Sequence, residues 1–92
     1  MDGTRQLELI QYIENVSRSF EVSEVRVFKG YRKRKDGGIK EVTIEIHDRG
    51  SELPAGRYRV IATDEDGRQA SGNGDNALDV VLSTVHWYRL DE

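Results

Sequence analysis

The amino-acid sequence predicts an α+β fold, in which a helix at each end of the chain flanks an antiparallel sheet of three to four strands. Two observations lead to this prediction. Apolar residues recur at helical spacing near both ends of the chain, and between them apolar and polar residues alternate with a period of two. The expected element order is therefore α-β-β-β-(short β)-α. Because each expected strand has one apolar and one polar face, we expect both terminal helices to pack on one face of the sheet.

The composition bounds the kind of protein that this chain can form. Residues 1–92 are too few for more than a single domain. The chain has no Cys, which excludes disulfides and thiolate metal sites. The N-terminal residues lack the basic region and apolar run of a secretory signal, and no stretch approaches the roughly 20 apolar residues of a membrane helix. We therefore expect a soluble, cytoplasmic protein with no membrane partner.

The first helix is expected over residues 4–19. Its apolar stripe recurs at helical spacing and comprises Leu9, Ile13, Val16 and Phe20, widened by Ile10 and Tyr12. Asp2 or Thr4 can cap the start of this helix by accepting a backbone N–H that has no partner within the helix.

Two strands joined by a tight turn are expected next. Asp36-Gly37 is typical of a two-residue type I′ turn, which requires positive φ at both positions. Such a turn would pair Val27 with Ile46 and Tyr31 with Val42, and so would gather the apolar residues of both strands on one face. A four-residue loop would keep the same register, and both alternatives stay open.

The rest of the chain completes the sheet and returns to a helix. A loop at residues 48–56 precedes a third strand at residues 57–64, and a short polar strand at residues 69–71 suits a sheet edge. The last helix is expected to begin at Asp75 or Asn76, with Asp79 in the position of a capping box. Its buried stripe would comprise Ala77, Leu78, Val81, Leu82, Val85 and Tyr88.

The element order, together with "DGRQASGNGDNALDVVL" (residues 66–82), resembles the double-stranded RNA-binding domain family. In that family a Gly-x-Gly passage precedes the last helix and is followed by Ser-Lys-Lys-x-Ala-Lys, whose lysines bridge phosphates. With Gly74 on the second glycine, Ala77, Leu78 and Val81 stand where those lysines belong. The Gly-Pro-x-His loop of the family also has no counterpart. The resemblance therefore implies the fold, and no binding residue is carried over from that helix.

A basic segment supplies the first candidate site. Residues 29–40 contain a single acid, Asp36, and six cations. The cations are Lys29, Arg32, Lys33, Arg34, Lys35 and Lys40. Such a cluster can neutralise nucleic-acid phosphates or bind an acidic protein. The alternative is a solvated hairpin end whose charges discourage association between strand edges.

The sheet face turned away from the helices is the second candidate. On the predicted register it would carry Arg26, Phe28, His47, Arg57, Arg59 and Ile61. Phe28 and Ile61 would then anchor a protein partner inside a polar rim. The alternative is an ordinary mixed surface with two isolated apolar residues.

No motif points to catalysis. His47 and His86 are the only histidines, and they do not stand in a metal-binding spacing. The glycine-rich turn at residues 71–77 lacks the lysine of a P-loop. We therefore expect no catalytic, cofactor-binding or metal-binding residues. The expected function is that of a small non-enzymatic binding module, either a monomer or a weak homodimer. Among the possible functions, binding of an unknown protein partner is preferred. Nucleic-acid binding through residues 29–40 is the alternative, and a small-ligand or catalytic role is the third.

Overall fold

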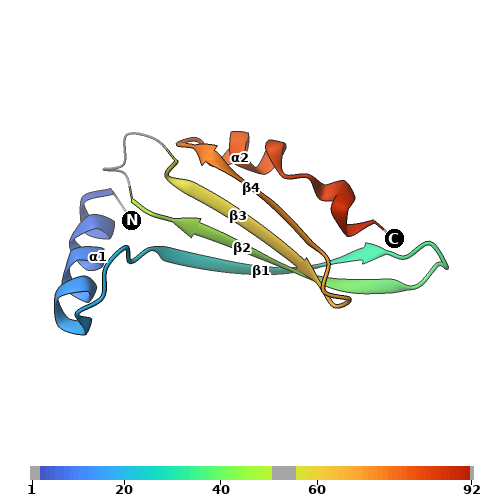
Figure 1. Ribbon diagram of the computed structural model, residues 1–92, viewed down its shortest axis with the longest axis horizontal. Helices are drawn as coiled ribbons and strands as arrows, with labels where there is room; N and C mark the ends of the chain where they lie inside the picture. The colour runs from blue at the N-terminus through green and yellow to red at the C-terminus, as the bar shows by residue number, and fades with distance from the viewer. Residues whose placement is uncertain (1–2, 51–55, 92) are drawn as a thin grey trace.

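A four-stranded antiparallel sheet with a helix at each end of the chain forms the protein in the computed structural model, which describes residues 3–50 and 56–91 (Figure 1). The elements are α1 (Gly3–Ser17), β1 (Glu24–Lys33), β2 (Ile39–Asp48), β3 (Tyr58–Asp64), β4 (Gln69–Asp75), α2 (Leu78–Thr84) and the 3-10 helix η1 (Trp87–Leu90). The sheet order β1-β2-β3-β4 follows the chain, so the strands form a simple meander. The predicted fold class is confirmed. The predicted caps, Asp2 and the Thr4 side chain, lie outside the described part of the structure.

The core lies where α2 and η1 pack on the sheet (Figure 1). It joins residues of β2, β3 and β4 to the C-terminal helices, and comprises Val42, Ile46, Val60, Ala62, Ala70, Val81, Val85 and Leu90. Gly72 of β4 permits the close approach of α2, because a Cβ there would lie 3.0 Å from the Val81 carbonyl oxygen and 3.0 Å from Val85 Cγ2. The indole Nε1 of Trp87 donates to the Leu82 carbonyl at 3.1 Å and ties η1 to α2.

The C-terminal helix differs from the prediction in two respects. It ends at Thr84, and the extended backbone of Val85 (ψ 133°) separates it from η1. Consequently Tyr88, predicted in the buried stripe, is exposed, and Leu90 is buried instead. The N-cap is Ala77, which has no side-chain cap, and not the predicted Asp75 or Asn76, although the Ala77 N–H donates to Asp75 Oδ1 at 2.9 Å.

The β1–β2 register is one residue away from the predicted one. Val27 lies opposite Glu45, not Ile46. The loop has three residues, since the N–H of Arg34 donates to the Gly38 carbonyl at 2.7 Å and the N–H of Gly37 donates to the Arg34 carbonyl at 3.1 Å. Gly37 has φ 91°, and a left-handed residue in this place is typical of three-residue hairpin loops. Because strand side chains alternate, a slip of one residue moves every side chain of β1 to the other face.

The sheet therefore has a helix face and an open face whose compositions differ from those predicted. The helix face carries Arg26 and Phe28 of β1 beside the apolar residues of β2 and β3. The open face carries Val25, Val27, Lys29, Tyr31, Glu41, Thr43, Glu45, His47, Arg59, Ile61, Thr63 and Ser71. The prediction that Arg26 and Phe28 share a face with His47, Arg59 and Ile61 is wrong.

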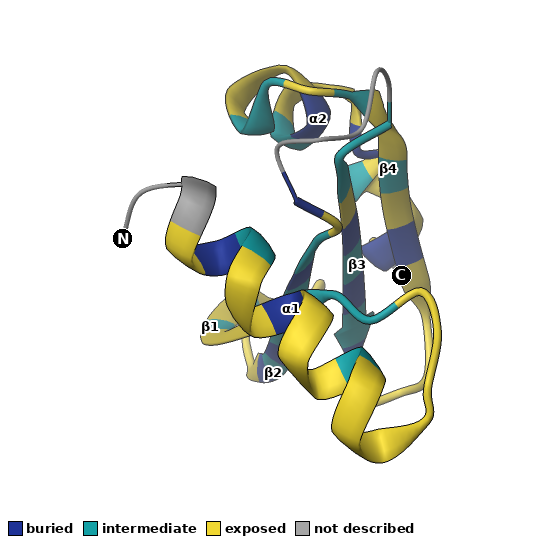
Figure 2. Cartoon of the chain, turned by 90° about the vertical axis from the view of Figure 1, so that its left-hand side faces the viewer, coloured by how far each residue is buried: buried dark blue, intermediate teal, exposed yellow. Residues whose placement is uncertain are grey.

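Helix α1 contacts the end of the sheet (Figures 1 and 2). Gln6 Nε2 donates to Asp48 Oδ2 at 2.7 Å and to Glu24 Oε2 at 3.1 Å, and both acceptors belong to the helix face. Ile10 is buried, but most of the helix is exposed (Figure 2), including Leu9 and Val16 of its apolar stripe. The helix is thus attached mainly by polar contacts near its N-terminus.

Candidate interaction surfaces

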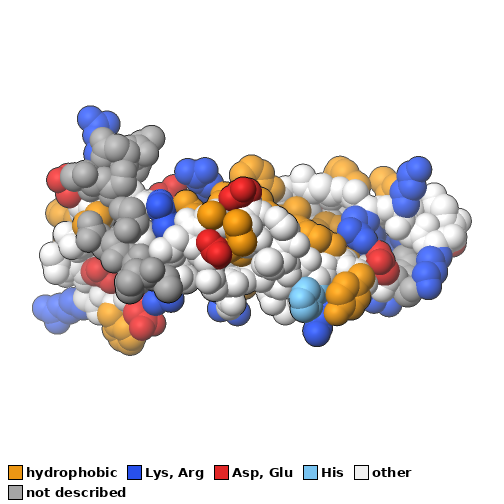
Figure 3. Space-filling view, turned by 90° about the horizontal axis from the view of Figure 1, so that it is seen from above, with side chains coloured by type: hydrophobic (Ala, Val, Ile, Leu, Met, Phe, Trp, Pro, Cys, Tyr) orange, Lys and Arg blue, Asp and Glu red, His pale blue; other side chains and the backbone are white. Residues whose placement is uncertain are grey.

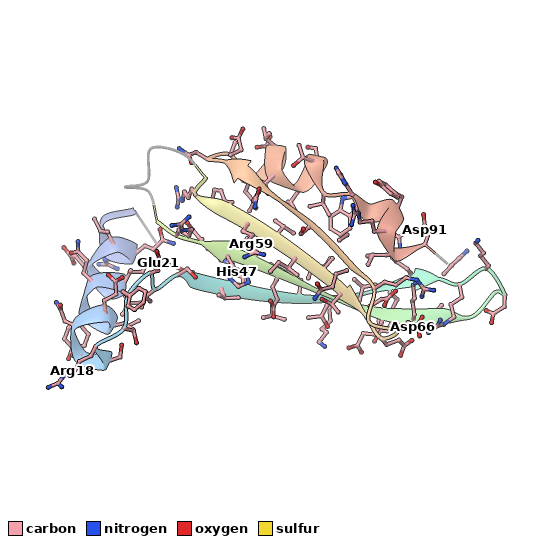
Figure 4. All side chains as sticks on the ribbon, viewed as in Figure 1. Arg18, Glu21, His47, Arg59, Asp66 and Asp91 are labelled. Carbon is pink, nitrogen blue, oxygen red and sulfur yellow. The ribbon has the colours of Figure 1, made fainter. Side chains whose placement is uncertain are left out.

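Three of the six cations in the basic segment are held by exposed or half-buried acids. Lys29 Nζ lies 2.8 Å from Glu41 Oε1 and also donates to Thr43 Oγ1 at 2.8 Å. Arg32 pairs with Asp91 at the C-terminal end of the described chain. Arg34 binds two acids of the β3–β4 turn, Asp66 at 2.7 Å and Glu65 at 3.0 Å (Figure 4 labels Asp66 and Asp91).

Lys40 is buried and therefore is not presented to a ligand. Its Nζ lies 2.9 Å from Asp64 Oδ2, and it also donates to the Leu90 carbonyl. Among the residues that the structure describes, Lys33 and Lys35 are the two members of the segment for which no ion pair is formed. Folding thus surrounds the basic segment with acids from β2, the β3–β4 turn and the C-terminal end, and these largely neutralise its charge.

Arg57 was predicted to lie on the open face of the sheet, but it binds Asp48 on the helix face instead. Its Nε and Nη2 bind the carboxylate of Asp48 at 2.7 and 3.0 Å, and Nη2 donates to Gln6 Oε1 at 3.2 Å. Partial burial alone would raise the pKa of Asp48, but the hydrogen bonds from Arg57 and Gln6 outweigh it and hold that pKa below 3.8. The pKa of Arg57 is raised, chiefly by its hydrogen bond to Asp48. Arg57 therefore fastens α1 to the sheet.

Strand β1 has a free edge and exposed apolar residues on both of its faces. It runs for ten residues, Glu24–Lys33, and within the described chain it pairs with β2 alone. On the open face Val25, Val27 and Tyr31 are 43, 56 and 69 % exposed, and on the helix face Phe28 is 51 % exposed. On the side seen from α2, hydrophobic side chains are instead scattered among charged ones (Figure 3).

A cleft of about 450 Å³, here named the end cleft, opens at the α1 end of the open face. Its walls are Glu21, Ser23, His47, Arg49, Gly56, Arg59, Asn73 and Gly74. Figure 4 shows His47 and Arg59 side by side on β2 and β3, with Glu21 toward α1. The strand pattern placed His47 and Arg59 on this face, whereas Arg49 and Asn73 gave no sequence signal because only the folded chain brings them together.

Two chemical classes of site can be checked on the described residues. Within residues 3–50 and 56–91, no three His, Asp or Glu side chains converge as the ligands of a metal ion would. None of the helices in those ranges is long and apolar enough to span a bilayer. Comparison with protein-family models, with curated proteins and with solved structures finds no match to this chain. The resemblance to the double-stranded RNA-binding domain stays a prediction.

Proposed function

We propose that the protein is a non-enzymatic protein-interaction module that binds by strand addition along β1, and that its partner strand is β1 of a second copy of the chain. The free ten-residue edge of β1, with apolar side chains exposed on both faces, carries this proposal. A long free edge with exposed apolar side chains templates pairing with another strand unless charged side chains, a bulge, a proline or a covering segment blocks it, and the charges of β1 restrict this pairing to one register. Within β1 there is no proline, and its pairing with β2 is continuous from Glu24 to Lys33.

The backbone of β1 is oriented for such pairing. Since the N–H of Arg34 donates to the carbonyl of Gly38, just before β2, alternate residues of β1 counted back from Arg34 point their N–H and C=O groups toward β2. The residues between them direct theirs to the free edge, and these are Val25, Val27, Lys29, Tyr31 and Lys33. An antiparallel second copy would satisfy these groups and would extend the sheet to eight strands with the open faces continuous.

The side chains favour one register for this pairing. When Phe28 lies opposite Phe28 of the second copy, Val25 lies opposite Tyr31, and Glu24 lies opposite Arg32. Phe28, Glu24 and Arg32 then occupy positions without mutual backbone bonds, where opposing side chains approach most closely. Cross-strand aromatic and opposite-charge pairs contribute roughly 0.2–1 kcal/mol each.

The neighbouring registers are less favourable. Centring the pairing on Lys29 places two ammonium groups opposite each other and sets Arg26 against Arg32. Centring it on Val27 leaves Glu24 opposite Gly30 and so removes the opposite-charge pairs. Like charges directly opposite each other destabilise a sheet, so the charges select the Phe28-centred register.

Sedimentation equilibrium over a range of concentrations tests the proposal. We expect a monomer–dimer equilibrium for the wild type, and monomers for Glu24→Arg and for Arg32→Glu, because each variant places like charges at both contacts of its own dimer. An equimolar mixture of the two variants should dimerise, since every contact in the mixed dimer joins opposite charges. Lys35→Glu, in the hairpin loop, is the matched control and should dimerise as the wild type does.

Two results would contradict the proposal. One is a wild type that stays monomeric up to about 1 mM. Its free energy of association would then be weaker than roughly 4 kcal/mol. The other is a mixture of the two charge variants that stays monomeric while the wild type dimerises. A monomer that binds labelled RNA or DNA at low salt, and loses this binding in Lys33→Ala/Lys35→Ala, would favour the nucleic-acid alternative instead.

A further inference from the structure

We propose that the end cleft binds the oxyanion of a small ligand, a phosphate or a carboxylate, between the guanidinium groups of Arg49 and Arg59. This inference does not depend on pairing through β1. The volume of about 450 Å³ falls within the range of small-molecule sites in proteins.

The sheet register builds the floor of the cleft. His47 of β2 lies opposite Arg59 of β3, and Arg59 lies opposite Asn73 of β4. These three residues therefore form a row across the open face, and they present an imidazole, a guanidinium and an amide side by side. Arg59 and Asn73 can donate hydrogen bonds to an oxyanion, whereas the Nε2 of His47 lies 3.3 Å from Glu45 Oε1.

The two arginines of the cleft differ from the other arginines of the sheet. Arg26, Arg32, Arg34, Arg57 and Arg68, which lie in or beside strands, each form an ion pair with an acid. Arg49 and Arg59 form none with any residue that the structure describes, although both line the same cleft. Guanidinium groups present a planar set of donors that fits carboxylate and phosphate oxygens.

The rim of the cleft adds a second feature. The segment after α1 reaches the cleft with Glu21 at φ 56°, a left-handed conformation that costs a residue with a side chain about 1–2 kcal/mol. It is held there by the N–H of Val22, which donates to Glu14 Oε2 at 3.2 Å. Strained conformations of this kind gather at binding sites. Glu21 is the one carboxylate among the described residues of the wall, and it opposes an anion, so removing its charge should strengthen binding.

Titration of the ¹⁵N-labelled protein with inorganic phosphate and, separately, with citrate tests this inference. Both titrations run at constant ionic strength, with chloride as the reference anion. We expect saturable shifts of the Gly56, Asn73 and Gly74 amides with one or both oxyanions, and the tighter one identifies the ligand class. Arg59→Ala and Arg49→Ala should each weaken binding about tenfold or more, because each removes charge-assisted hydrogen bonds.

Two further variants make the test specific. Glu21→Gln should tighten binding several-fold, whereas Arg18→Ala removes an exposed cation at the outer end of α1 that is not part of the cleft and should leave binding unchanged (Figure 4). Shifts that rise linearly with both anions would overturn the inference. Equal weakening by Arg18→Ala and Arg59→Ala would also overturn it, since the effect would then reflect overall charge.

Discussion

At the scale of single residues, the buried pair of Lys40 and Asp64 is the most consequential feature. The two side chains are 1 % and 0 % exposed, and Asp64 Oδ1 also accepts the N–H groups of Asp66 at 3.0 Å and Arg68 at 2.8 Å. Burial alone would raise the pKa of Asp64, but the hydrogen bonds from Lys40 and from the Arg68 N–H outweigh it and lower that pKa below 3.8. The pair thus joins the ends of β2 and β3 to η1, since Lys40 also binds the Leu90 carbonyl.

Removing the lysine of this pair should be severely destabilising. Lys40→Ala leaves a buried carboxylate without its cation, a change that typically costs about 3–5 kcal/mol. Lys35→Ala removes an exposed lysine of the same segment and should change stability by less than about 0.5 kcal/mol. Urea unfolding followed by circular dichroism measures both. Equal midpoints for the two variants would show that the buried pair contributes nothing.

Acid should destabilise the protein through Asp48 and Asp64. The folded-state pKa of each lies below 3.8, so the unfolded chain takes up these protons at a higher pH than the folded chain. Their stabilisation is therefore complete well above pH 3.8 and is lost as the pH falls through and below that value. Free energies of unfolding measured from pH 7 to pH 2 should decline less steeply in Asp48→Asn than in the wild type. Parallel curves would contradict this assignment.

At the scale of elements, the hairpin shows what the sequence pattern could and could not specify. The helix face of β2 follows from Val42 and Ile46, because their neighbours in the chain are polar. In β1 the pattern is ambiguous, since Val27 and Phe28 are adjacent and face opposite sides. Only the loop then decides the register, and Asp36-Gly37 fits both a two-residue turn and the last two positions of a three-residue loop.

The end cleft was only partly predictable for a related reason. His47 and Arg59 are strand residues whose face follows from alternation, and the prediction placed both correctly on the open face. Arg49 follows the end of β2 and Glu21 precedes β1, so no periodicity governs them. Their place in the wall depends on how the connecting segments fold over the end of the sheet.

Engineered disulfides can verify the register of β1 against β2. Val27 and Glu45 are opposed on the open face at a position without mutual backbone bonds, where opposing Cα atoms lie about 4.5 Å apart. That distance suits a disulfide, and the chain contains no other Cys. Val27→Cys/Glu45→Cys should therefore oxidise readily to an intramolecular disulfide, measured as the loss of free thiols in the monomer. Val27→Cys/Ile46→Cys should stay reduced, because its thiols lie on opposite faces, and the reverse outcome would restore the predicted register.

At the scale of the whole molecule, the protein is elongated, with extents of 49 × 25 × 21 Å, and its two helices are attached to the sheet differently. Helix α2 rests on the apolar core formed with β2, β3 and β4 (Figure 1). The α1 end rests on Gln6, Asp48 and Arg57 together with the buried Ile10. Apolar burial supplies most of the free energy that holds elements together, so α1 should be less firmly attached than α2.

We therefore expect α1 to open before the sheet unfolds. An isolated helix of 15 residues is marginally stable in water, so α1 should lose its backbone hydrogen bonds once Gln6 and Arg57 release it. Native-state hydrogen exchange should show α1 amides exchanging faster than those of Val60 and Ala62 in β3. Gln6→Ala should accelerate exchange in α1 and leave the β3 amides unchanged, whereas Gln11→Ala, an exposed position on the same helix, should alter neither. Equal acceleration of α1 and β3 by Gln6→Ala would mean instead that the polar attachment of α1 stabilises the whole fold.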